Sequence, residues 1–298
     1  MFNLLQAEWI KLSRRPMAHI LLAIFLVLLL LSLILYYVVI GFHEGTLTGG
    51  LGTITFLDEA QIQQYRQQLQ FPGIYGAVFN QINASGGILA IVLAAGAMGS
   101  EYGWGTLRVQ LARQPRRGRF LIAKVLVLLL VVLIAMAIAL VLGTIAAIIF
   151  GFFIGEIGSL TLGQLLLLPV SMLQALLVML PYVMVTMAMS IMGRSVLAGM
   201  AGGVIFLLLD VSLGALSFLA EMGGPFIFLY NLLIQQNINA LVVANSSYYG
   251  LDTAAISPFN LELLPHPLQA AVVVLVYSGL FFGYAYFWFV RHDIFGAA

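Results

Sequence analysis

The sequence predicts an all-α polytopic membrane protein, and two observations indicate this fold class together. Of the 298 residues, 62% are hydrophobic and only 8% are charged, whereas soluble domains carry about 25% charged residues. A helix rises about 1.5 Å per residue, so about 20 apolar residues cross the hydrocarbon core of a bilayer. Six segments are apolar over such a length, and we expect them to form one transmembrane domain over residues 1–298. These six expected spans are 17–40, 82–98, 120–153, 165–192, 196–220 and 268–290.

The segment 2–15, which precedes the first span, is amphipathic. Its apolar residues recur every three or four positions, and Lys11, Arg14 and Arg15 give it a basic side. This pattern is typical of a helix that lies among the lipid headgroups with Trp9 as an anchor. The alternative is a charge cluster that directs insertion without forming a defined helix. The residues expected in the interfacial helix are Phe2, Leu5, Glu8, Trp9, Lys11 and Leu12.

The first apolar run is longer than the roughly 7–15 residues of a signal-peptide core and lacks a small-residue cleavage site, so we interpret it as a retained span. The third span is too long for one perpendicular crossing. It must tilt, break near Gly143, or protrude from the bilayer.

Two segments between the spans also have helical character. The first outer loop contains a polar helical stretch over 57–69. Between the fifth and sixth spans, the apolar stretch Phe226–Ala244 is interrupted by Asn and Gln residues. It is too polar at its centre for a lipid-facing span, so we expect a partial or re-entrant helix on the outer side.

The basic residues predict the orientation of the chain. If the N-terminus is inside, 11 of the 12 Lys and Arg residues fall on the cytoplasmic side, and only Arg66 lies outside. Cytoplasmic loops of membrane proteins carry an excess of Lys and Arg. We therefore expect both termini in the cytoplasm, in a multi-pass protein of the cell (plasma) membrane that contacts membrane lipids.

Half of the positive charge lies from Arg108 to Lys124, in the loop between the second and third spans and at the start of the third. The start of this loop is less polar, because Trp104, Leu107 and Leu111 are spaced i, i+3 and i+7 and would share one helix face. Such a stripe, flanked by arginines, is typical of a protein-docking surface. The alternative is a stop-transfer loop in which Trp104 only anchors in the lipid headgroups.

The residues E-Y-G-W-G-T-L-R from Glu101 to Arg108, followed by Pro115, Arg119 and Lys124, resemble a motif of the permease subunits of the ABC-2 family. Further features are similar to that family over essentially the whole chain. They are the Glu8-x-x-Lys11 pattern in an amphipathic N-terminal helix, the six spans, and the ending Phe289-Val290-Arg291-His292-Asp293.

The resemblance implies that Glu101 to about Arg113 forms a cytoplasmic coupling helix, inserted into a cleft of a separate nucleotide-binding subunit. It also implies a second permease copy or paralogue, and an exporter in which the partner ATPase binds ATP and Mg. The coupling residues implied in this way are Glu101, Tyr102, Gly103, Trp104, Gly105, Thr106, Leu107, Arg108, Leu111 and Arg113.

The residue inventory argues against other functions. A phosphate-binding loop needs the pattern G-x-x-x-x-G-K-[ST], but the two lysines, Lys11 and Lys124, do not follow glycine. The chain has no cysteine, and its four histidines lie at span ends or in loops without an H-E-x-x-H pattern. We therefore expect a permease subunit with no catalytic residue, metal site or cofactor of its own, and no nucleic-acid partner.

Asp210 is the one clear candidate for an ionisable residue on an ion path within the expected spans. Asp210 is about two thirds of the way outward along the fifth span, and such residues often mark ion pathways. The alternative function is therefore a secondary transporter or channel that uses Asp210. A structural role, with hydrogen bonds from neighbouring polar groups, is the simpler interpretation.

Overall fold

The computed structural model describes residues 2–47, 57–107, 110, 116–216, 222–251 and 261–291. Within these residues the chain is an all-α bundle with six helices long and apolar enough to cross a membrane, which confirms the predicted fold class. A bent helix pair between the fifth and sixth of these helices raises the count to seven if the pair is one span.

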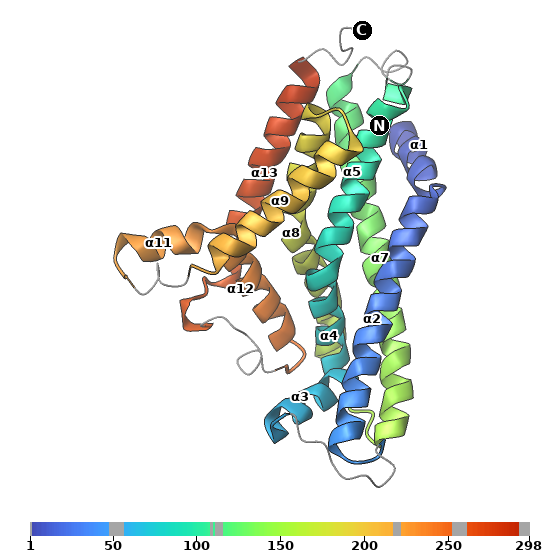
Figure 1. Cartoon of the computed structure of the whole chain (residues 1–298), viewed down its shortest axis with the longest axis vertical. Coiled ribbons are helices and arrows are strands. Elements are labelled where there is room, and N and C mark those ends of the chain that lie inside the picture. The colour runs from blue at the N-terminus through green and yellow to red at the C-terminus, as the bar shows by residue number, and fades with distance from the viewer. Residues whose placement is uncertain are drawn as a thin grey trace.

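The helices follow one another in the order labelled in Figure 1. They are α1 (Phe2–Ser13), α2 (Pro16–His43), α3 (Glu59–Leu69), α4 (Gly73–Gln81), a π-helical turn η1 (Ile82–Gly86), α5 (Gly87–Gly103), α7 (Arg117–Ile154), α8 (Leu162–Met192), α9 (Val196–Gly214), α11 (Pro225–Leu232), α12 (Ile234–Ser247), a 3₁₀ turn η2 (Leu261–Leu263) and α13 (Pro267–Arg291).

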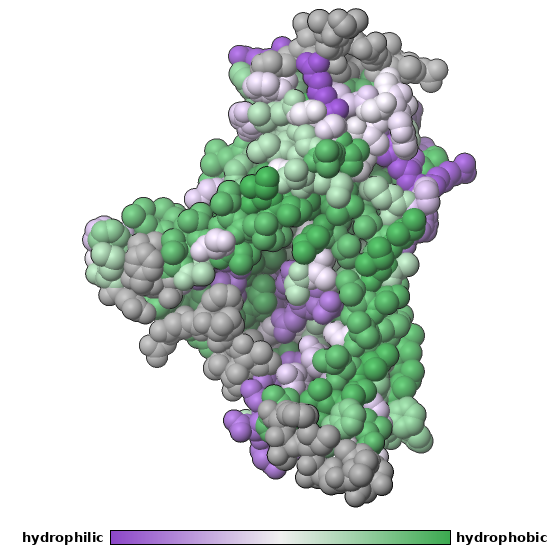
Figure 2. All heavy atoms as spheres, in the orientation of Figure 1, coloured by the Kyte–Doolittle hydropathy of each residue, from purple (hydrophilic) through white to green (hydrophobic). Residues whose placement is uncertain are grey.

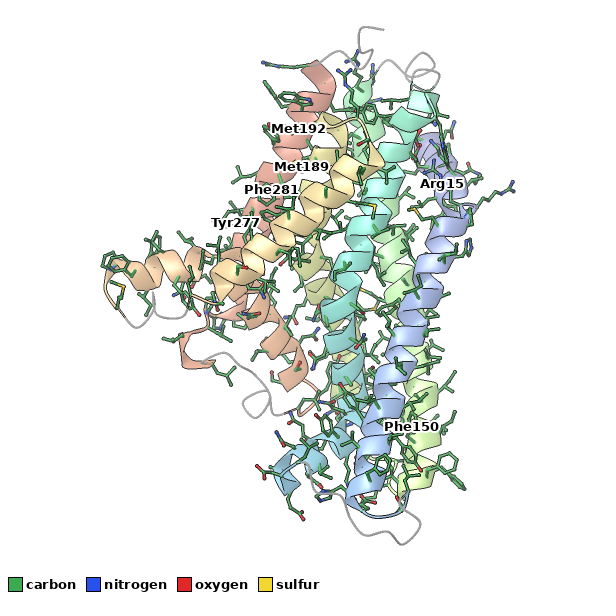
Figure 3. All side chains as sticks on the ribbon, in the orientation of Figure 1. Arg15, Phe150, Met189, Met192, Tyr277 and Phe281 are labelled. Carbon is green, nitrogen blue, oxygen red and sulfur yellow. The ribbon has the colours of Figure 1, made fainter. Side chains whose placement is uncertain are left out.

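Helix α8 is the centre of the bundle, and its apolar span is the most buried of the six. It packs against α13, α9 and α5, while α2 and α7 lie side by side on the other flank of α5 (Figure 1). Both ends of the described chain lie at the same end of the bundle. Figure 3 shows Arg15 toward that end and Phe150 toward the opposite end, where the Phe150 ring packs 5.4 Å from that of Tyr37.

Helix α9 approaches its neighbours closely through glycines. Gly199 and Gly203 face Ser190 and Thr186 of α8, and Gly99 of α5 faces the backbone of Val196. Small residues at such positions let helix backbones approach each other. The glycine stripe of α9 is therefore occupied by helices of this same chain.

The second span begins nine residues earlier than predicted, because α4, η1 and α5 form one apolar helix over Gly73–Gly103. Asn80 and Gln81 indicated a span end, but the side chains of both are paired within the bundle. Ser246 Oγ donates to Asn80 Oδ1 at 2.8 Å, and Gln81 Nε2 donates to Ser85 Oγ at 3.1 Å. Local pairing of this kind removes most of the cost of burying polar groups.

The third span is a single unbroken helix of 38 residues, α7. Gly143 does not break it; the glycine instead gives room to the Val78 side chain of α4. A helix of this length is about 57 Å long, well beyond the roughly 30 Å of hydrocarbon. A break near Gly143 is therefore excluded, and the helix must either tilt in the bilayer or protrude from it.

Helical structure also lies outside the six long helices, as the sequence predicts. Asp58 caps α3 through a capping box with Gln61, and Arg66 of α3 pairs with Glu44 after α2. Between the fifth and sixth spans, α11 and α12 are bent by 71° at Leu233. Whether this pair is re-entrant or external stays a prediction. The face seen in Figure 2 is largely apolar over α2, α9 and α11, with a polar surface in the hollow between them.

Candidate functional site

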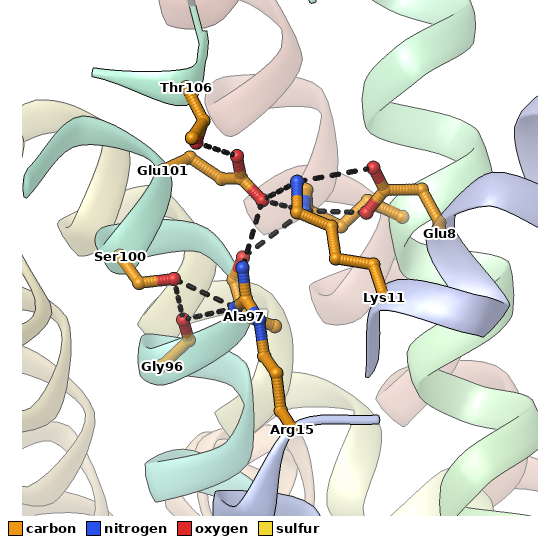
Figure 4. A network of polar contacts seen from close by, with 9 residues as sticks. Glu8, Lys11, Arg15, Gly96, Ala97, Ser100, Glu101 and Thr106 are labelled. Carbon is orange, nitrogen blue, oxygen red and sulfur yellow. Dashed lines mark hydrogen bonds and ion pairs between the residues drawn. The ribbon is translucent and has the colours of Figure 1, made fainter. Parts of the chain in front are cut away.

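Five charged side chains meet where α1, α5 and α7 come together (Figure 4). We call Glu8, Lys11, Arg15, Glu101 and Lys124 the ionic cluster. Glu8 and Lys11 come from α1, Arg15 from the break between α1 and α2, Glu101 from the last turn of α5, and Lys124 from the second turn of α7. The cluster therefore joins the beginning of the chain to both helices that flank the basic loop.

Lys124 binds both carboxylates of the cluster. Its Nζ atom lies 2.7 Å from Glu8 Oε2 and 3.1 Å from Glu101 Oε1, and it also donates to the Ala97 carbonyl at 3.1 Å. Three acceptors match the three protons of an ammonium group. Lys124 is only 4% exposed, so these contacts replace the water that its charge would otherwise bind.

Glu101 is fully buried and receives hydrogen bonds and ion pairs on both oxygens. Oε1 pairs with Lys124 and Lys11, and with Arg15 Nη2 at 3.5 Å. Oε2 accepts a hydrogen bond of 2.6 Å from Thr106 Oγ1. A carboxylate removed from water needs this many partners to remain charged.

Arg15 connects α2 to the end of α5. Its Nη1 atom donates to Ser100 Oγ at 2.8 Å and to the Gly96 carbonyl at 3.4 Å. Its guanidinium also lies 4.9 Å from the centre of the Trp104 ring, within the range of a cation–π contact. Arg15 thus touches both the ionic cluster and the segment that follows α5.

The cluster contains three cations and two carboxylates, so its formal charge is +1. Burial lowers the pKa of Lys11, and the neighbouring charge of Lys124 lowers it further, while the contacts with Glu101 and Glu8 oppose this shift. Burial and the charge of Lys124 therefore both disfavour the protonated, charged form of Lys11, the third cation of the cluster. Lys11 is the cluster's most exposed member, which fits its being the cation in excess.

The segment after α5 turns back over the ionic cluster. Helix α5 ends at Gly103, Trp104 follows with 66% of its surface exposed, and Gly105 has a φ of +64°, a conformation that glycine adopts without strain. This turn brings Thr106 within reach of Glu101. Tyr102 is half-buried and packs against the core.

Leu107 is only 1% exposed and belongs to the hydrophobic core of this chain. The stripe expected from the spacing of Trp104, Leu107 and Leu111 is therefore not one outward surface: Trp104 points outward, whereas Leu107 anchors the segment to the bundle. Spacing alone misplaced Leu107, because the turn at Gly105 rotates it away from Trp104. Arg108, Leu111 and Arg113 lie outside the described residues, and the coupling role of the segment stays a prediction.

The N-terminal helix is confirmed over Phe2–Ser13, two residues shorter than expected. Leu5 and Trp9 pack against the core and Leu12 is buried in it, whereas Phe2 is exposed. Glu8 shares the inward face, because it pairs with Lys124. The apolar side of α1 is thus used for packing on α7 and its neighbours, and a position among lipid headgroups stays a prediction.

Asp210 lies apart from the ionic cluster, in the C-terminal part of α9, and it caps helix α12. Its Oδ1 atom accepts the Gln235 backbone N–H at 3.1 Å, and its Oδ2 atom accepts the Tyr182 hydroxyl at 2.7 Å. Gln235 is the second residue of α12, whose own N-cap, Leu233, has no capping side chain. A carboxylate at a helix N-terminus pairs a free N–H group and complements the helix dipole. This geometry fits the structural role of Asp210.

The sequence marks Glu8, Lys11, Glu101 and Lys124 separately, as motif positions, and Arg15 as part of the basic side of segment 2–15 and as a topological charge. One signal for their meeting was present: Glu8, Lys11 and Arg15 are spaced i, i+3 and i+7, the spacing of one helix face. Their common partners lie up to 116 positions away along the chain. No periodicity within one helix reports a contact over that separation.

Neutral substitutions within the ionic cluster should have unequal effects on stability. Glu101→Gln leaves three cations with one carboxylate, so we expect the loss of about 3–5 kcal/mol that follows when one partner of a buried ion pair is removed. Lys11→Met leaves two cations with two carboxylates, so no charge is left uncompensated and we expect a clearly smaller loss. Thermal unfolding of both variants in the same detergent makes the comparison, and equal losses would contradict this charge balance.

Asp210 should tolerate asparagine better than leucine. Asp210→Asn keeps an oxygen that accepts the Gln235 N–H, whereas Asp210→Leu leaves that N–H and the Tyr182 hydroxyl without this acceptor, at a cost of about 1–3 kcal/mol. Thermal unfolding should therefore rank the wild type and Asp210→Asn close together, and Asp210→Leu well below them. A folded, assembled Asp210→Asn variant that no longer transports would instead favour an ion pathway.

Comparison with known proteins agrees with the resemblance carried by the Glu101–Arg108 motif. The family model described as ABC-2 family transporter protein matches residues 2–294. No curated protein matches the chain closely enough to add to this assignment. The match includes α1, the ionic cluster and all six long helices, so the chain belongs to the ABC-2 family of transporter proteins.

Proposed function

We propose that this chain is the permease subunit of an ATP-driven exporter, and that its basic end docks on separate ATPase subunits. Two permease subunits, identical or related, form the pathway, and the ATPases bind ATP and Mg. The ionic cluster carries this proposal, because Thr106 of the segment after α5 bonds Glu101, which in turn pairs with α1, with the break before α2 and with α7.

The cluster's contacts fit a role in transmitting movement. Thr106 and Trp104, which follow α5, touch Glu101 and Arg15, and these two residues in turn contact α1, α2 and α7. A displacement of the segment by an ATPase would act on all four elements through short polar contacts. Tightly packed elements of this kind move as units rather than deforming continuously. ATP-dependent closure of the ATPases would in this way alternate the access of the pathway.

The surface around Trp104 has the composition of a docking site. Trp104 is the exposed aromatic side chain of the segment, and the guanidinium of Arg15 lies over its ring. Tryptophan and arginine are among the residues enriched at the energetic centres of protein interfaces. The positive charge of the ionic cluster and of the arginines that begin α7 would favour an acidic rim on the partner.

Trp104→Asp should weaken the docking of the ATPase while leaving the bundle folded, because Trp104 is exposed. Burial of a large apolar side chain contributes about 1.5–3 kcal/mol, so the affinity should fall about tenfold or more. The measurement is the amount of ATP-binding-cassette subunit that co-purifies with the tagged chain in mild detergent, together with transport-linked ATP hydrolysis. Trp104→Phe should retain most of both signals.

Leu107→Asp is the matched comparison, because Leu107 is buried in the chain's own core. That variant should lower the unfolding temperature, which Trp104→Asp should leave near the wild-type value. If Trp104→Asp keeps a wild-type amount of ATPase and normal hydrolysis, the segment is not the coupling element.

We also propose that the end of the bundle with the ionic cluster faces the cytoplasm, with both termini on that side. The chain has no cysteine, so the labelling of a single introduced cysteine reports the side of the membrane on which that position lies. Gln63→Cys and Ser247→Cys, both at exposed positions on the opposite side, should react with an impermeant maleimide in intact cells. Arg116→Cys, also exposed, should react only after permeabilisation. Labelling of Arg116→Cys in intact cells would reverse the orientation.

A further inference from the structure

An apolar cavity of about 180 Å³ lies inside the subunit, between α2, α5 and α7, with one side chain from α8. Neither the ionic cluster nor Asp210 lines it. Its wall is almost entirely hydrocarbon and includes Phe25, Leu89, Leu93, Val132, Met136 and Met179. Apolar cavities of this size stay free of water and accept apolar ligands.

The shape of the cavity fits a chain better than a compact molecule. Its lining residues on α5 and the preceding turn run from Ile82 to Leu93, a length of about 16 Å along the helix axis. Trp9 and Ser13 of α1 line one end, near the basic end of the bundle. The cavity is therefore a slot that leads from the level of α1 into the middle of the bundle.

The slot opens toward lipid. Ile134 of α7 lines the cavity and is 39% exposed, and His19 near the start of α2 lines it and is also exposed. Both helices are candidate membrane spans. In that setting the molecules that reach the opening are the acyl chains of the adjoining leaflet, because water is excluded from the hydrocarbon core.

Polar groups are placed at the end of the slot where a headgroup would lie. Ser13 and His19 line this end, and the exposed Arg14 follows Ser13 directly. The ionic cluster adds a formal charge of +1 on the neighbouring side of α1. Basic groups between membrane helices at this depth attract the phosphates of anionic lipids.

We propose that this slot is a binding site for a resident anionic phospholipid. A stretch of one acyl chain occupies the cavity between α2, α5 and α7, and the phosphate lies beside Ser13, Arg14 and His19. The ligand would hold the sparsely packed α2 against the rest of the bundle. The proposal does not depend on the docking of an ATPase.

Native mass spectrometry of the detergent-purified chain tests the site, with phosphatidylglycerol and phosphatidylcholine of matched acyl chains as probes. We expect one phosphatidylglycerol per subunit, bound about tenfold more tightly than phosphatidylcholine. Ala90 lines the cavity and is buried, so Ala90→Phe should fill the slot and reduce binding about tenfold or more. The control, Ala201→Phe, lies at an exposed position on α9 and should bind normally.

The contact with the headgroup is tested by a second pair of variants, one at the site and one control. Arg14→Ala should remove most of the preference for phosphatidylglycerol, whereas Arg119→Ala, which removes an exposed arginine from the start of α7, should keep it. Equal affinity of the wild type for the two lipids would overturn the proposal. Normal binding by a folded Ala90→Phe variant would also overturn it.

A fluorescence measurement decides the question if Ala90→Phe does not fold. The chain has three tryptophans, and Trp104→Phe with Trp288→Phe leaves only Trp9, which lines the slot. Phosphatidylglycerol with brominated acyl chains, added in detergent, should quench Trp9 with a plateau near one lipid per subunit. Quenching that rises in proportion to added lipid without a plateau would show nonspecific contact and reject the site.

Discussion

The arrangement of the basic end of this protein depends on the burial of one carboxylate. Glu101 lies at the end of a membrane-length helix with no exposed surface, where an unpaired charge costs several kcal/mol. Its partners come from α1, from the break before α2, from α7 and from Thr106. Satisfying this one group therefore determines where four separate segments of the chain must lie.

Two polar sites of the bundle, the ionic cluster and Asp210, solve the same problem in different ways. At the basic end, ammonium and guanidinium groups neutralise two carboxylates. On α9, Asp210 is paired with a phenol and with the first turn of α12, without a cation among its hydrogen-bond partners. The first arrangement joins α1, the break before α2, α5 and α7. The second holds α12 in place against α9 and α8.

The sequence predicted the helices well because their evidence is local. Six apolar runs of membrane length became six helices, and the Glu8-x-x-Lys11 pattern lies on the predicted N-terminal helix. Errors arose where tertiary contacts override local polarity. Asn80 and Gln81 seemed to end a span that continues through them, because their partners, Ser246 and Ser85, are paired with them inside the bundle. Leu107 was misplaced because one glycine turn changed its direction, and Arg15 was overlooked because its partners are distant in sequence.

The wide separation of the cluster's members along the chain has a consequence for membrane insertion. Glu8 and Lys124 are 116 positions apart, so α1 leaves the ribosome long before α7 exists to receive it. Until then Glu8 and Lys11 must remain hydrated at the membrane surface, since neither can enter hydrocarbon unpaired. The N-terminal helix can therefore reach its final place only after the third span has been synthesised, and the shortest chain able to complete the cluster is one that already includes Lys124.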